Sequence, residues 1–368
     1  KGEIKMKKLL INAMMIMVLF PASVWGIAPP HPNNSNIFRS KTESPPLYSS
    51  KILEFPSVLE EERKILFILV DFMDKSAQTK KEYFLELGSR ISNYYYQNSN
   101  EKLKLFINTT DWITLNDSGD TLENIFEKTI NKINPEIDFS IYDALVIVHA
   151  GRGQEESWDE KDIWSQVIPI SFIVDGKKFE KIAFLPEMTG MKPCTLGIPA
   201  HELGHLICGL PDLYKASYNP NPPGIIGNWG VMGTGAWNGE DSPDGNNPAP
   251  IDNWCKYQLG WGDISILENS EIYKDQISID SSIINKCWNS DFSNNFFLIS
   301  YYLEEGGFLL LKVNENKFEV IAADNFFDSD TGDLWSQKNF NNSISYSPLI
   351  GKYGIVDLKI NFIFDNEE

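Results

Sequence analysis

Up to about residue 150, short apolar runs alternate with stretches in which apolar residues recur at helical spacing. The runs at residues 64–72 and 144–150 have the pattern of buried strands. Between them, residues 80–97 and 122–133 carry apolar side chains three or four positions apart, as on one face of a helix. Further short strand candidates cover residues 103–107 and 112–115. This alternation predicts a mixed α/β domain.

After about residue 265 the pattern changes to short β-prone runs that are separated by turns rich in Asn, Ser and Asp. These runs cover residues 296–302, 308–313, 318–322 and 355–364. They predict a smaller antiparallel, sandwich-like β domain over residues 266–368. Together the two patterns predict an α+β fold in which the mixed α/β domain covers residues 62–265.

The N-terminus has the parts of a secretory signal peptide. A basic start at residues 6–8 precedes an apolar run at residues 9–20, which is short for a membrane span. We therefore expect residues 1–26 to be a signal peptide, with residues 1–5 as extra upstream sequence. The protein is then expected to be secreted and extracellular, with no membrane anchor after cleavage. Residues 27–61, rich in Pro, Ser and Asn, are expected to form an extended lead-in or a short pro-segment.

The net charge of the chain bears on which partners it can bind, and its cysteines bear on whether it forms disulfides. The 368-residue chain has a formal net charge of −19 and a pI near 4.7. Nucleic-acid binding needs a basic face, so this charge argues against a nucleic-acid partner. Export would permit one or two disulfides among Cys194, Cys208, Cys255 and Cys287, but the pairing stays open. Cys194 and Cys208 are alternatively small buried apolar residues.

The chemically most informative segment runs from His201 to His205 and reads HELGH. Residues four apart lie on one face of a helix, so the two imidazoles can bind one Zn²⁺ ion. Glu202 projects toward the open position of the metal, where it can take a proton from water and pass it to a leaving amine. The chain has 4 histidines, and two of them fall in this pattern. The motif therefore predicts a zinc-dependent peptidase with Glu202 as the catalytic acid/base.

The motif leaves the third metal ligand open. Gly209 and Pro211 end the helix and turn the chain back, and Asp212 follows as an oxygen donor. Asp212 is thus the first candidate for the third ligand. It could instead cap a turn, or hold a histidine in orientation without binding the metal itself. The alternatives are Glu187, Glu240 and Asp252.

Several blocks besides this motif resemble, in the same order, those of the immune inhibitor A-like family of secreted bacterial zinc metallopeptidases. They include ILFILVDFMD, YYYQNSNEKLKL and VIVHAGRGQEES before the motif, and GIIGNWGVMGTGAWNG and PAPIDNWCKYQLGW after it. The resemblance covers residues 62–265 and implies a zincin-like catalytic domain with an active-site helix. It also implies that Met232 lies in a turn that forms an apolar floor beneath the zinc ligands.

The chain departs from this family in the spacing after the second histidine. Three residues separate His205 from Gly209, where the family usually has two. One additional residue rotates a helical side chain by about 100°. Either the turn absorbs the extra residue, or Asp212 is not the third ligand.

Two further sites are weaker candidates. His149 ends a predicted buried strand and is a candidate transition-state donor, a residue that supports the metal ligands from behind, or a structural histidine. Asp328, Asp330 and Asp333 surround a glycine in an acidic turn that could bind Ca²⁺, although the spacing is not that of an EF-hand. A solvated acidic turn is the simpler interpretation.

Three functions remain compatible with the sequence. The first is a secreted endopeptidase that acts on extracellular proteins or peptides. The second is a secreted binding or adhesion protein with a degenerate or structural metal site, and the third is a hydrolase of amide bonds in non-peptide substrates. Glu202 favours an enzyme, because a structural zinc site needs no base beside its ligand. The pattern does not predict an oligomeric state.

Overall fold

The structure is a computed structural model that covers most of the predicted elements. It describes residues 26–31, 61–216, 219, 221–240, 243–267, 271–272, 283–287, 295–302, 307–314, 317–321, 344–351 and 354–360. Residues 1–25 of the predicted signal peptide, residues 32–60 of the lead-in and the acidic turn at 328–333 lie outside the described residues. No helix in the described part of the chain has the length and apolar character needed to span a membrane.

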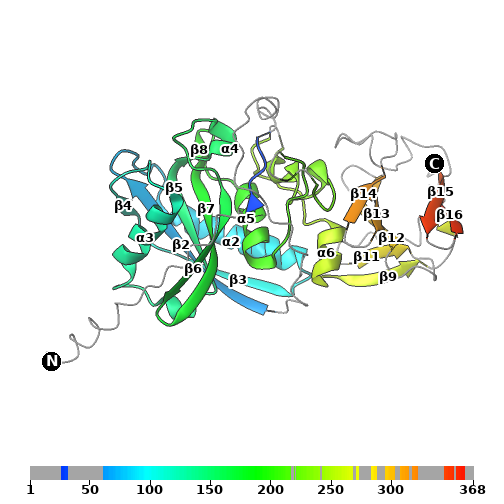
Figure 1. Cartoon of the computed structure of the whole chain (residues 1–368), viewed down its shortest axis with the longest axis horizontal. Coiled ribbons are helices and arrows are strands. Elements are labelled where there is room, and N and C mark those ends of the chain that lie inside the picture. Colours follow the sequence, from blue (N-terminus) through cyan, green and yellow to red (C-terminus); the bar gives the residue numbers. More distant parts are fainter. Residues whose placement is uncertain are drawn as a thin grey trace. The chain divides into compact units, whose positions relative to one another are not determined.

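Two compact units divide the chain, and the first, which contains residues 62–93 and 104–209, is built on a mixed sheet. This 8-stranded sheet has the order β1-β6-β7-β5-β2-β3, with β4 beside β2 and β8 beside β7 (Figure 1). Strands β2, β4, β5 and β7 pair in parallel, whereas β1, β6 and β8 pair antiparallel with their neighbours. The strands are β1 Gly26–Ile27, β2 Glu61–Phe72, β3 Leu103–Thr109, β4 Ile113–Leu115, β5 Ala144–Arg152, β6 Gln166–Val174, β7 Lys177–Thr189 and β8 Lys192–Pro193.

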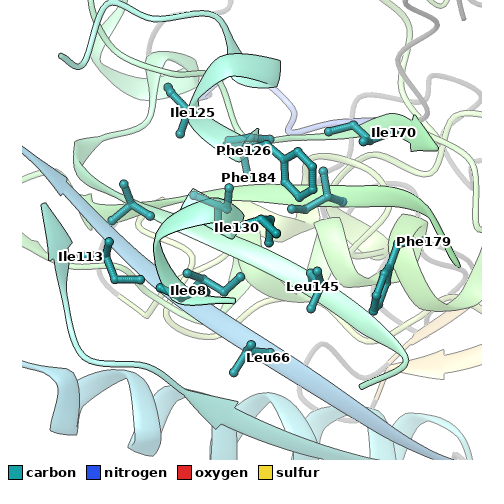
Figure 2. Close-up of a cluster of buried hydrophobic side chains, with 14 of the residues drawn as sticks. Leu66, Ile68, Ile113, Ile125, Phe126, Ile130, Leu145, Ile170, Phe179 and Phe184 are labelled. Carbon is teal, nitrogen blue, oxygen red and sulfur yellow. The ribbon is translucent and has the colours of Figure 1, made fainter. Parts of the chain in front are cut away.

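Helices cover both faces of this sheet. On one face, α3 packs Ile125, Phe126 and Ile130 onto strand residues such as Leu66 and Phe184 (Figure 2). Helix α5 contributes no residue to this cluster and packs against β7, β6 and β1, which places it on the opposite face. The helices are α2 Lys81–Asn98, α3 Leu122–Ile133, α4 Gln154–Ser157 and α5 Gly197–Cys208, with a 3-10 turn η2 at Phe139–Ile141.

The hairpin of β6 and β7 is a part of the sheet that the sequence analysis did not predict. Its two-residue turn is Asp175-Gly176, and both residues have positive φ. An Asp-Gly pair between apolar runs is a strong hairpin signal, because this turn type requires positive φ at both positions. At the free edge of β6, residues 26–27 add the short strand β1, so the described start of the lead-in is extended.

The second unit, which contains residues 94–103 and those from 210 onward, holds two further sheets. One has the order β14-β13-β12-β11-β9 and the other β10-β16-β15. Strands β11 to β14 and the pair β15–β16 are antiparallel as predicted, whereas β9 pairs in parallel with β11 and β10 with β16. The α+β class with a second, β-rich region is confirmed. The strands are β9 Asp263–Leu267, β10 Glu271–Ile272, β11 Ile283–Cys287, β12 Asn295–Tyr302, β13 Gly307–Asn314, β14 Lys317–Val320, β15 Ile344–Gly351 and β16 Gly354–Ile360, and they follow η3 Gly227–Trp229, η4 Thr234–Trp237 and α6 Asn253–Leu259.

Candidate metal centre

Helix α5 carries the predicted motif and is buried along nearly its whole length. Every residue of Gly197–Cys208 is buried except Ile207, which is partly exposed. A helix that is apolar on all sides belongs in a core, so its polar side chains are exceptions that need a reason. His201 and Glu202 are 0% exposed and His205 is 1% exposed.

The two histidines direct the same ring nitrogen to one point. Nε2 of His201 lies 3.0 Å from Nε2 of His205, and the ring planes meet at 83°. Two nitrogens that bind one zinc ion at 2.0–2.1 Å with tetrahedral angles lie about 3.3 Å apart. The pair therefore has nearly the spacing that a single metal ion requires.

Asp212 follows the end of α5 and lies close to the two histidines. Gly209, with φ of 65°, donates its N–H to Gly204 O, five residues back, whereas a helix joins residues four apart. The chain thus leaves α5 through a turn that is one residue wider than a helical turn. One donor atom each from His201, His205 and Asp212 lies within 4.8 Å of the others.

The chemistry of this group suits a metal. Two imidazole nitrogens and one carboxylate oxygen are typical of catalytic zinc sites, which keep a further position open for water or substrate. Calcium instead takes six to eight oxygen ligands. All three side chains are buried, and Asp212 is 1% exposed. Because buried polar and charged groups are costly unless they are bound, the burial also favours a bound cation.

Glu202 lies on the same buried helix, directly after the first histidine. Both of its carboxylate oxygens are shielded from solvent. A carboxylate in this position can hold a proton close to the metal, as the motif predicts.

The three alternative ligands are not part of this group. Glu187 binds backbone N–H groups: Oε1 accepts from Gln78 at 2.5 Å and from Thr79, and Oε2 accepts from Gly151 at 3.0 Å. Its carboxylate thus joins the loop between β2 and α2 to the end of β5. Asp252 caps α6 through Oδ1, which accepts from Trp254 and Cys255 N–H at 3.0 and 3.1 Å. The side chain of Glu240 is exposed.

His149 is buried at the end of β5 and is likewise not in the metal-ligand group. It is 1% exposed, and its Nδ1 lies 3.1 Å from Ala150 O. Burial lowers the pKa of His149 to about 4, so the imidazole is neutral at pH 7. Its role as a transition-state donor stays a prediction.

Met232 and the three cysteines whose side chains are described are buried. Met232 is 0% exposed, and its carbonyl accepts from Leu213 N–H at 2.8 Å, which ties its turn to the segment that carries Asp212. Cys194, Cys208 and Cys255 are free and buried, as small apolar residues are. Burial raises the pKa of Cys194 and of Cys208 to about 12, so neither thiol is a ready metal ligand.

One contact at this helix was not anticipated from the sequence. Lys181 of β7 donates from Nζ to the backbone carbonyl of His205 at 2.7 Å. The only sequence signal is a lysine that directly precedes the apolar run at residues 182–185. Every residue has a backbone carbonyl, so the sequence does not indicate that Lys181 would bond to that of His205. The predicted calcium site at Asp328, Asp330 and Asp333 lies outside the described residues and stays a prediction.

A comparison with models of known protein families finds a match that includes the candidate metal ligands. Residues 131–262 match the model of the family described as immune inhibitor A peptidase M6, catalytic domain. The matched range contains His201, Glu202, His205 and Asp212. A comparison with curated protein sequences found no match. Over residues 131–262 the chain is thus similar to the catalytic domain of the immune inhibitor A peptidases of family M6, and this match indicates a metallopeptidase, a hydrolase that acts on peptide bonds.

Proposed function

We propose that the protein is a secreted, zinc-dependent endopeptidase that cleaves extracellular proteins or peptides. The observation that carries the proposal is the buried group of His201, His205 and Asp212, whose donor atoms lie within 4.8 Å of one another. The donor set favours zinc over calcium or magnesium, which prefer oxygen ligands alone.

His201, His205 and Asp212 would hold the metal, and Glu202 would manage the proton. A bound zinc ion supplies Lewis-acid chemistry that allows water to lose a proton near neutral pH. Glu202 accepts that proton and later donates it to the amine that leaves. The side chain of Glu202 is buried, so bulk water does not compete for the proton that it holds.

Substitution of Glu202 tests this division of roles. Glu202→Gln keeps the size of the side chain and removes the base, so zinc content should be unchanged while casein cleavage falls at least about 100-fold. Glu240→Gln is the matched control, because Glu240 is an exposed glutamate outside the metal-ligand group. A Glu202→Gln protein that cleaves as fast as wild type would show that the mechanism is wrong. Wild type that binds peptide without cleaving it would instead support a binding protein.

The proposal of secretion rests on the sequence of residues 6–26, with its basic start and apolar run. Expression in a bacterial host should place the protein in the culture medium, with an N-terminus near Ile27. Intact protein that is retained in the cells with residues 6–26 attached would contradict export.

A further inference from the structure

The last turn of α5 differs from an ordinary helix end in where its carbonyl groups bond. In a regular helix the N–H of Gly209 would bond to the carbonyl of His205, four residues back. Here the N–H of Gly209 bonds to Gly204 O, five residues back. The carbonyl of His205 accepts a hydrogen bond from outside the helix.

Lys181 is that external partner. It lies on β7, opposite Pro169 of β6, and α5 packs against both strands. Its Nζ donates to His205 O at 2.7 Å, the length of a strong charge-assisted hydrogen bond. A cation at the C-terminal end of a helix also interacts favourably with the helix dipole.

We propose that Lys181 is a positioning residue for the metal: it fixes the backbone of His205 in the wider final turn and so keeps the imidazole aimed at the metal. The last carbonyls of a helix lack intrahelical partners, and such ends fray. Fraying at His205 would move a ligand that must be held to within about 0.5 Å. Lys181 thus supports the end of the helix that carries His205.

This inference rests on the proposed zinc site and is tested by metal affinity rather than by activity. Lys181→Met keeps the apolar stem and removes the donor. Zinc affinity, measured by competition with a chelator, should fall at least about 10-fold, because groups that support metal ligands contribute on this scale. Bound cobalt should show altered visible absorption bands, which report the ligand geometry; a lysine that only stabilised the fold would leave them unchanged at saturation.

Two further variants complete the test. Lys178→Met is the matched control: Lys178 lies on the same strand, its side chain is 55% exposed, and it pairs with Glu180 at the surface. Its zinc affinity and cobalt spectrum should equal those of wild type. Lys181→Arg keeps a cationic donor and should recover most of the affinity.

The possible results separate the two proposals. A folded Lys181→Met protein with wild-type zinc affinity and cobalt spectrum overturns the positioning role but leaves the zinc site standing. If Lys181→Met does not fold, Lys181→Gln is measured in its place, with the same expected loss and the same refuting result. A wild-type protein that binds no zinc refutes the proposed function itself.

Discussion

Glu155 offers a test of the electrostatics of the first unit, away from the metal ligands. Its side chain is 1% exposed, Oε1 accepts from Ser165 Oγ at 2.6 Å, and Oε2 accepts from Ser165 N at 3.0 Å. Burial raises the pKa of Glu155 from 4.5 to about 7, more than the two hydrogen bonds lower it, and the nearby Glu156 adds to the rise. The folded protein therefore favours the protonated carboxyl group.

The sign of the pH dependence follows from this shift. Below pH 4.5, Glu155 is protonated in both the folded and the unfolded chain, and its contribution is full. Between pH 4.5 and about 7 the unfolded chain gives up this proton while the folded chain keeps it, so stability falls as pH rises. Above pH 7 the loss is complete. A shift of about 2.5 pKa units corresponds to about 3 kcal/mol.

Glu155→Gln isolates this contribution. The amide cannot ionise and has nearly the shape of the protonated acid. The variant should match wild type in free energy of unfolding at about pH 4 and exceed it by up to about 3 kcal/mol at about pH 8. Urea unfolding followed by tryptophan fluorescence measures both values. Glu136→Gln, at an exposed position, should show no such trend. A Glu155→Gln difference that does not grow with pH would refute the reasoning.

Three further predictions concern the loops, the helix end and the cysteines. Glu187→Gln should lower the free energy of unfolding by about 2 kcal/mol in urea titrations, because its amide N–H₂ would face the N–H of Gly151; unchanged stability would contradict the role of this carboxylate. Gly209→Ala and Gly176→Ala both place alanine at positive φ, and the added Cβ has no atom within 4 Å. Each should therefore lower the free energy of unfolding by about 1–2 kcal/mol. Of the two, Gly209→Ala alone should weaken metal binding. Cys194, Cys208 and Cys255 should react with a thiol reagent only after unfolding, since all three are buried; rapid labelling of the folded protein would refute this.

The periodic elements of the first unit were readable from the sequence. The helix predicted at residues 122–133 matches α3 residue for residue, and the strand predicted at 64–72 lies within β2. These segments satisfy a single local rule, the spacing of apolar residues. The hairpin of β6 and β7 was missed because Pro169 and Pro186 interrupt its apolar runs and resemble loop signals. The pairing of β9 with β11 joins strands that are distant in sequence, which local patterns cannot encode.

The candidate site also has some features that the sequence predicts and others that it does not. His201 and His205 follow from helical spacing, which is a local property of the chain. Asp212 follows a turn in which Gly209 bonds five residues back, and the spacing of residues in the sequence does not predict that bond. The contact of Lys181 with the His205 carbonyl involves the backbone of one partner and lies 24 positions away in sequence.

X-ray absorption at the zinc edge of the purified protein tests the proposed metal centre most directly. We expect one zinc ion per chain with nitrogen and oxygen neighbours at about 2.0–2.2 Å, including two imidazoles, and a loss of zinc affinity in Asp212→Ala. Sulfur neighbours at about 2.3 Å would contradict the assignment of His201, His205 and Asp212 as ligands. Failure to bind zinc in stoichiometric amount would contradict the centre itself.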